Sequence, residues 1–308
     1  TGTAQWTQIQ TTNAPSARAG SAAAYDSARG QTVLFGGEVG FSFSDETWTY
    51  DGRDWSQAAP ATKPKGRAEA ALVMDSLRGV VLMYGGNAGG GPWGGPANDE
   101  TWEWNGTDWK MLTPAATPGG LTRAGAAFDI GRNRLVVYGG VPDSSFPIAS
   151  GNTWEFDGTT WTQITPADPP GPREGASMCY DVARNRVVMF GGLDPQVGGF
   201  KDTWEYDGAA WTRLPASVSG PVARTMGRMV YDTNRKVCIL HGGMDPLNGN
   251  ILNDVWQFDG KAWTLKTSEG AVGSPPKRGG AAVAWDFGRN KLVVFGGDGG
   301  SSTTLMND

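Results

Sequence analysis

The chain has 308 residues, with 26 Lys and Arg against 31 Asp and Glu, and a formal net charge of −5. An acidic chain without a basic run is poorly suited to non-specific nucleic-acid binding, and no apolar run is long enough to cross a bilayer. One histidine and two separated cysteines argue against a zinc or copper site and against a Ser-His-Asp triad.

One segment recurs about every fifty residues, and it begins with an arginine, small residues, an aromatic or Met, and then Asp. The first copy is RAGSAAAYD, residues 18–26. A turn such as DSARG follows, and then an apolar run that ends in Gly-Gly. Six such pairs occur, beginning at Gly36, Gly85, Gly139, Gly191, Gly242 and Gly296. A fixed period of this length indicates a repeat protein.

The next part of each copy holds two tryptophans on either side of an Asp-Gly or Asn-Gly pair. By itself such a segment resembles a sugar site, with aromatic platforms and carboxylates. It occurs five times, however, and a segment built five times is scaffold rather than a unique active site. The copies are ETWTYDGRDW (46–55), ETWEWNGTDW (100–109), NTWEFDGTTW (152–161), DTWEYDGAAW (202–211) and DVWQFDGKAW (254–263).

Each copy predicts four short antiparallel strands. The first runs from the arginine to the Asp, the second into Gly-Gly, the third contains Thr-Trp, and the fourth carries the second Trp after a tight hairpin. Four strands at this period form a propeller blade. The Gly-Gly pairs, the aromatic of the Thr-Trp segment and the second Trp resemble the kelch-repeat family, in its bacterial style. That resemblance implies an all-β, six-bladed β-propeller and says little about activity.

The two ends of the chain predict how the propeller closes. The N-terminal stretch TGTAQWTQIQ looks like a fourth strand, with Trp6 matching Trp55 and Trp161. We expect it to join the C-terminal blade, so that residues 1–308 form one closed domain without free edges. The third strand of that blade is missing after Asp308. We expect the chain to continue there, the alternative being a strand that is lost or supplied by another segment.

The loops between second and third strands vary in length and lie on one face, which favours binding there. They contain Phe41, Phe43, Trp93, Phe146 and Phe200. We predict ligand contacts for Trp93, Phe146 and Phe200; the alternative is that these aromatics cover neighbouring blades. Cys179 and Cys238 lie in strands of different repeats, where we expect core packing rather than a disulfide.

Six arginines open the first strands, and we expect them to ring the central channel on the variable-loop face. Arginine binds carboxylates and phosphates bidentately. In some kelch adaptor domains, arginines at this place grip acidic peptides, and the resemblance implies such a role for these six positions only. The alternative is that each pairs with a carboxylate or carbonyl and organises its repeat. They are Arg18, Arg67, Arg123, Arg173, Arg224 and Arg278, and the acids after Gly-Gly are Glu38, Asp143, Asp194, Asp245 and Asp298.

These features predict a non-catalytic binding module that recognises an acidic peptide, protein loop or anionic glycan at the channel mouth. The predicted ligand residues are the six arginines, Trp93, Phe146, Phe200, Asp194, Asp245 and Asp298. One alternative is an enzyme (a lyase, epimerase or hydrolase) that acts on an acidic sugar, with its acid–base groups among Asp194, Asp245, Asp298 and His241. An unpaired carboxylate in a deep polar channel would favour that reading. A third reading is a structural repeat domain of a larger secreted protein.

We assign no catalytic residue, no cofactor and no metal. We expect a monomer without nucleic-acid binding or membrane insertion, located outside a bacterial cell or in its envelope.

Overall fold

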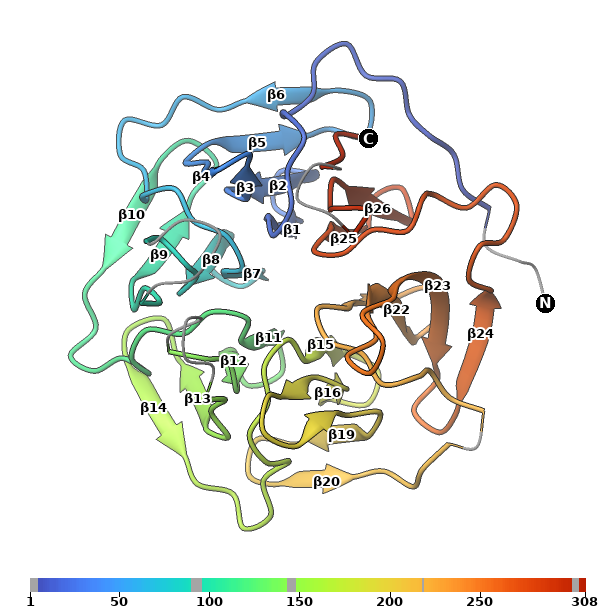
Figure 1. Cartoon of the computed structure of the whole chain (residues 1–308). Helices are drawn as coiled ribbons and strands as arrows, with labels where there is room; N and C mark the ends of the chain where they lie inside the picture. The colour runs from blue at the N-terminus through green and yellow to red at the C-terminus, as the bar shows by residue number, and fades with distance from the viewer. Residues whose placement is uncertain (1–4, 90–95, 143–147, 218, 301–304) are drawn as a thin grey trace.

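A computed structural model describes residues 5–89, 96–142, 148–217, 219–300 and 305–308 (Figure 1). Throughout these ranges the regular elements are β-strands, and no helix is long and apolar enough to span a membrane. The strands form sheets arranged around a central axis, each with its first strand innermost (Figure 1).

Five sheets have four antiparallel strands each. From the axis outward they are β1 (Ala22–Asp26), β2 (Gln31–Phe35), β5 (Thr47–Tyr50) and β6 (Trp55–Gln57); β7 (Ala71–Asp75), β8 (Val80–Tyr84), β9 (Thr101–Trp104) and β10 (Trp109–Leu112); β11 (Gly125–Asp129), β12 (Arg134–Tyr138), β13 (Thr153–Phe156) and β14 (Trp161–Ile164); β15 (Ser177–Asp181), β16 (Arg186–Phe190), β19 (Thr203–Tyr206) and β20 (Trp211–Arg213); and β21 (Arg228–Asp232), β22 (Val237–Met244), β23 (Ile251–Phe258) and β24 (Trp263–Thr267).

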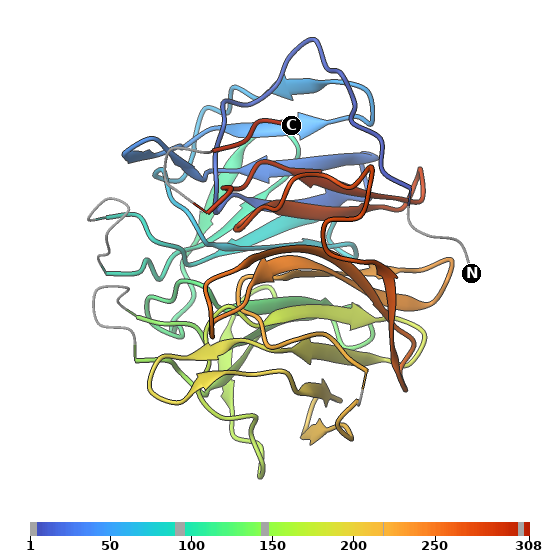
Figure 2. The same ribbon diagram turned by 45° about the vertical axis from the view of Figure 1, so that its right-hand side comes forward.

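A sixth unit consists of two strands, β25 (Ala282–Asp286) and β26 (Lys291–Phe295). Two short hairpins project from the variable loops, β3 (Glu38–Val39) with β4 (Ser42–Phe43), and β17 (Leu193–Asp194) with β18 (Gly198–Gly199). Figure 2 shows the β3–β4 hairpin standing out from its face.

The six inner strands follow one another around a closed ring, because β25 contacts both β21 and β1. The predicted all-β propeller with four-stranded antiparallel blades is therefore confirmed. The prediction of six such blades is not: in the described ranges five blades are complete, and the sixth unit has two strands.

The second Trp of each repeat joins one blade to the preceding one. Trp211 lies 5.0 Å from Tyr206 of its own hairpin and 5.2 Å from Tyr138 of the preceding blade, measured between ring centroids. Its indole N–H donates to Thr153 Oγ1 at 2.9 Å, which satisfies the polar atom of a buried ring. Around the ring the equivalent contacts between blades are Phe35–Trp109, Tyr84–Trp161, Tyr138–Trp211, Phe190–Trp263, His241–Trp6 and Phe295–Trp55.

Trp6 thus occupies the position predicted from its match to the other tryptophans, 5.3 Å from His241. Residues 5–10 nevertheless form no assigned strand, so the predicted N-terminal strand is not observed. The Trp6 indole N–H is buried without a partner, because Val255 stands where the other blades place the accepting Thr. In the complete blades the outer strand pairs with the third strand, and the described part of the β25–β26 unit has no third strand for this segment to join.

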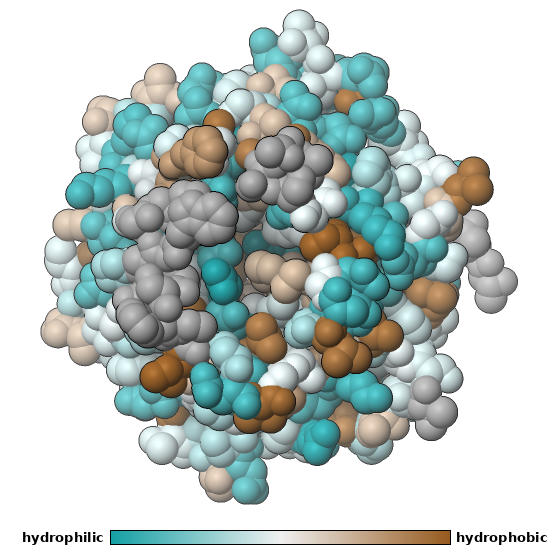
Figure 3. Space-filling model, viewed as in Figure 1, coloured by the Kyte–Doolittle hydropathy of each residue, from teal (hydrophilic) through white to brown (hydrophobic). Residues whose placement is uncertain are grey.

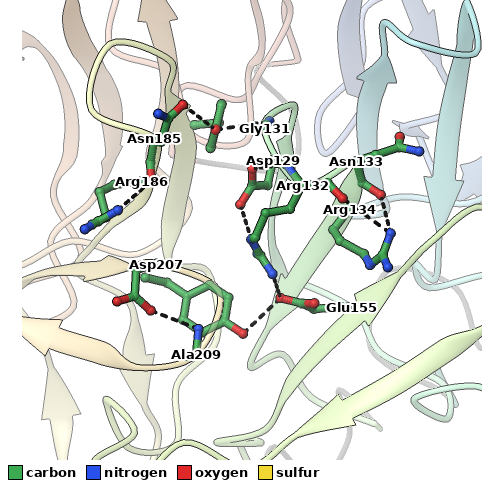
Figure 4. Close-up of polar contacts among 12 residues, drawn as sticks. Asp129, Gly131, Arg132, Asn133, Arg134, Glu155, Asn185, Arg186, Asp207 and Ala209 are labelled. Carbon is green, nitrogen blue, oxygen red and sulfur yellow. Dashed lines mark hydrogen bonds and ion pairs between the residues drawn. The ribbon is translucent and has the colours of Figure 1, made fainter.

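The turn between first and second strands carries a second contact between blades (Figure 4). Arg132 donates from Nε to Asp129 Oδ2 at 2.7 Å and from Nη1 to Glu155 Oε1 at 2.7 Å. Glu155 also accepts from the Tyr206 hydroxyl of the next blade at 2.9 Å. The arginine then lies over Gly208, whose φ is +102°. A Cβ on Gly208 would come within 2.5 Å of Arg132 Nε, so this glycine is required both by the turn and by its neighbour.

We predict that Gly208→Ala destabilises the chain by about 1–3 kcal/mol, because it adds backbone strain and displaces Arg132. The measurement is the free energy of unfolding in denaturant. Gly119→Ala is the matched control, because Gly119 has φ +83° and a Cβ added there would meet no atom within 4 Å. Equal losses in the two variants would contradict a role for the Arg132 contact.

Candidate functional site

Five of the six predicted arginines lie inside the blades. Arg224 donates to the Gly242 carbonyl at 2.9 Å and binds Asp254 with both Nη atoms, at 2.7 and 2.9 Å. Asp254 also accepts from the indole of Trp256 at 2.7 Å. The same clasp of an arginine to a Gly carbonyl and a carboxylate joins Arg18 to Glu46, Arg67 to Glu100, Arg173 to Asp202 and Arg278 to Asp308.

The expected ring of six guanidinium groups around the channel is therefore wrong. The five clasped arginines are 1–3 % exposed, and their charge is neutralised within the blade. Arg123 differs because it lies six residues before the Asp that ends its strand, whereas the others lie eight before. Leu121 occupies the clasp position in that blade, and Asn152 replaces the carboxylate. With the arginine gone, the matching acid is gone as well.

The other predicted residues are scattered. Phe200 packs on the Arg173 guanidinium, 4.0 Å from its ring centroid, so it covers a blade. Asp194 is buried and accepts from the Gln196 amide, and Asp245 accepts from the Leu247 amide in its own loop. Trp93, Phe146 and Asp143 lie outside the described residues. Of the described acids that follow Gly-Gly, Asp298 and Glu38 line a cavity at the channel mouth.

That cavity has a volume of about 180 Å³ and opens on the variable-loop face, which Figure 3 shows hollowed at the centre of the ring. Below it the channel continues as a second space of about 260 Å³, lined largely by small and apolar side chains of the inner strands. The charged and large side chains of the mouth are Glu38, Phe43, Glu69, Arg123, Met226, Arg228 and Asp298.

Four of these side chains break the repeat. Glu69, Arg123 and Met226 have φ of +59°, +55° and +54° at a position that three other repeats fill with Gly20, Gly175 and Gly280. Left-handed backbone at a residue other than glycine is unfavourable and concentrates at functional sites. The fourth is Arg228, and the equivalent positions hold only small residues, Ala22, Ala71, Gly125, Ser177 and Ala282. Residues that depart from the repeat and converge on one cavity point to a site.

Arg123 is neutralised within the mouth. Its Nε donates to Glu69 at 2.8 Å, and its Nη1 donates to both oxygens of Glu174 at 3.1 and 3.2 Å. Burial opposes its charge, but Glu69 and Glu174 outweigh that effect and raise the pKa of Arg123. This triad fixes one side of the mouth.

Arg228 has no such partner. Its Nε donates to the Ala281 carbonyl at 3.2 Å, and within the described ranges its two Nη groups have neither a hydrogen bond nor an ion pair. Burial lowers the pKa of Arg228, and the charge of Glu69 acts in the opposite direction. Because Arg228 lines both the mouth and the channel below, its guanidinium stands at the floor of the mouth.

Two carboxylates of the mouth also lack a cation. Asp298 accepts from the Gly300 amide at 2.9 Å, and the Glu38 side chain has no hydrogen bond within the described part of the chain. Burial, together with the negative charges of Glu69 and Asp298, raises the pKa of Glu38. No three His, Cys, Asp or Glu side chains of the described residues are grouped as metal ligands.

His241, the remaining acid–base candidate, lies outside the mouth. It is 3 % exposed, packs on Trp6, and burial lowers its pKa to about 4. The predicted core role of Cys179 and Cys238 agrees with the structure, where both are buried, reduced and part of one apolar cluster.

Comparison with protein families supports the fold. Residues 126–308 match the family model of the KLHDC2/KLHL20/DRC7 Kelch-repeats domain, which covers more than half of the chain. A search of curated proteins finds no match.

We predict opposite roles for two arginines four residues apart. Arg224→Met leaves Asp254 buried without its partner and lowers the free energy of unfolding by about 3–5 kcal/mol. Arg228→Met removes a guanidinium that has no ionic partner, so we expect a change of less than about 1 kcal/mol. Denaturant unfolding of both variants measures this difference. Similar losses would show that Arg228 is also a scaffold residue.

Proposed function

The chain belongs to the kelch-repeat family of β-propellers, and on that premise we propose that it is a protein-binding module whose channel mouth receives an acidic side chain of a partner loop or peptide. Kelch propellers commonly serve as protein-interaction modules. The observation that carries the finer proposal is the Arg228 guanidinium, which lies at the floor of a cavity with both Nη groups unpaired among the described residues. A carboxylate is the group that such a fork binds best.

Exposed apolar residues around the mouth support a protein partner over a glycan. Phe41 at the tip of the β3–β4 hairpin is 85 % exposed, Val197 in the β17–β18 hairpin 75 %, and Leu247 in the β22–β23 loop 91 %. Glu38 of the Phe41 hairpin itself lines the mouth, which places tip and cavity on one face. Apolar tips around a polar centre are typical of protein interfaces, whereas a glycan offers few apolar contacts.

We also propose that the β25–β26 unit is the sixth blade of the ring. Two observations support this: its inner strand closes the ring between β21 and β1, and Arg278 and Asp308 repeat the clasp of the complete blades. Trp6 lies against His241 as the outer Trp of a sixth blade would.

A second candidate function is acid–base catalysis on an anionic substrate held by Arg228. The observation that favours it is Glu38, a carboxylate without an arginine partner in the described ranges, whose pKa is raised in a polar cavity. We rank it below binding because no second group among the described residues of the mouth stands out as its acid–base counterpart. Turnover of uronates or other acidic sugars, lost in Glu38→Gln, would reverse that ranking.

We predict that acidic peptides bind the chain and that Arg228→Met weakens binding by about tenfold or more, because a charge-assisted contact is lost. Fluorescence anisotropy with a peptide library measures this. Arg53→Met is the matched control, since Arg53 is exposed in a turn away from the mouth. Phe41→Ala combined with Leu247→Ala tests the tips and should weaken binding further. Binding that Arg228→Met leaves unchanged would contradict the proposal.

Binding of an acidic peptide that lacks basic residues should depend on pH. Because the pKa of Glu38 is raised, acidification protonates Glu38 before the peptide carboxylates and removes one repelling charge beside Arg228. The other charges at the mouth are Glu69, Asp298 and Arg123. We expect affinity to rise roughly threefold to tenfold from about pH 7 to about pH 5. In Glu38→Gln the affinity at neutral pH should already be high and the dependence weaker; an unchanged profile would exclude Glu38 as its source.

A further inference from the structure

We propose that the partner segment is bipolar: beside the carboxylate that Arg228 binds, it carries a cationic side chain that Glu38 and Asp298 bind. This deepens the proposed function and rests on it.

The charges of the mouth fall into two groups. Arg123, Glu69 and Glu174 form a closed triad with contacts of 2.8–3.2 Å. Arg228, Glu38 and Asp298 belong to the same mouth, yet in the described part of the chain no ion pair joins the arginine to either acid. The second group is therefore a cation and two anions that, among the described residues, form no ion pair around one cavity of about 180 Å³.

These three residues come from neighbouring units of the ring. Arg228 begins β21, and its Nε bond to the Ala281 carbonyl directs it toward the unit of β25. Asp298 bridges to Gly279 in that unit, and Glu38 bridges to Ala19 in the next, beside β1. β25 contacts both β21 and β1. One short segment entering the mouth can therefore meet the cation on one side and the two acids on the other.

A purely acidic partner fits this arrangement poorly. It would satisfy Arg228 but bring a further negative charge beside Glu38 and Asp298, where burial and the charges of Glu69 and Asp298 already raise the pKa of Glu38. A Lys or Arg on the same segment gives both acids an opposite charge, and paired charges at a desolvated site discriminate strongly between partners. The charge pattern of the mouth thus selects for an acid and a base close together on one peptide.

The test uses four blocked peptide series on one neutral Gly/Ser background, with the full chain as receptor. In every series the two variable positions are either adjacent or a few residues apart. The four series carry Asp and Lys, Asp and norleucine, Asn and Lys, or Asn and norleucine at these positions. Isothermal titration measures affinity for the wild type, for Arg228→Met, and for Glu38→Gln combined with Asp298→Asn. Thermal unfolding of each variant serves as the folding control.

We expect an Asp–Lys peptide to bind at least about tenfold more tightly than its Asp–norleucine counterpart, because one charge-assisted contact is worth about that much. The decisive readout is a change of sign. Glu38→Gln with Asp298→Asn should weaken the Asp–Lys peptide and strengthen the Asp–norleucine peptide, whereas a merely structural role of the two acids would shift both in the same direction.

Two failures are distinguishable. If Asp–norleucine binds as tightly as Asp–Lys and the double substitution strengthens both, the partner is simply acidic; the bipolar inference is then wrong and the proposed function stands. If no peptide binds, or if Arg228→Met changes none of them, the proposed function fails together with the inference.

Discussion

The clasp made by a buried arginine in five of the six repeats is the interaction on which the rest of the propeller depends. Its side chain fastens the first strand to the Gly-Gly carbonyl and to the carboxylate that precedes the third strand, as in Arg224 with Gly242 and Asp254. Its carbonyl accepts from the second glycine of the preceding unit, Gly192 for Arg224 and Gly297 for Arg18. One residue thus holds its own blade together and ties it to its neighbour. The bond from Gly297 to Arg18 closes the ring between the first and last units.

The logic of a repeat separates scaffold from site. Positions that recur, such as the clasp arginine, its acid and the second Trp, make the same contacts in blade after blade. Where a structural position departs from the repeat, its partner position departs as well: Leu121 replaces the clasp arginine, and Asn152 replaces the carboxylate. At the mouth Glu69 and Arg123 are paired with each other, whereas Arg228 has no ionic partner in the described part of the chain. Glu69, Arg123 and Met226 accept an unfavourable backbone conformation, and Arg228 places a guanidinium among small residues, all at one cavity.

Most of the fold could be predicted from the sequence, because period, Gly-Gly, Asp-Gly and the paired tryptophans each have a local physical meaning. No local pattern, however, fixes the direction in which a side chain points at the start of a strand. An arginine there can turn toward the channel or into the blade, and only the distant carboxylate two strands away decides. The sequence pattern places Arg123 with the clasp arginines, although its distance from Asp129 differs by two residues. Counting back four residues from the Asp that ends each first strand would likewise have identified Arg228 as the only large residue at that position. The two-stranded sixth unit agrees with the lack of a sixth Thr-Trp segment in the sequence. The unpaired N-terminal segment, in contrast, depends on strand pairing that no local pattern specifies.

The two kinds of arginine also explain how such a scaffold can change its partner without losing its fold. A clasp arginine is bound to a buried acid, so its loss leaves an unpaired charge in the blade and threatens the whole ring. Among the described residues the Arg228 side chain donates one hydrogen bond, to a backbone carbonyl, and the acids Glu38 and Asp298 lie on separate units with their own backbone bridges. Substitutions at these three positions alter the charges that a partner meets but leave every clasp in place. If the mouth is the proposed binding site, it can therefore be retuned between acidic, basic and bipolar partners at little cost in stability.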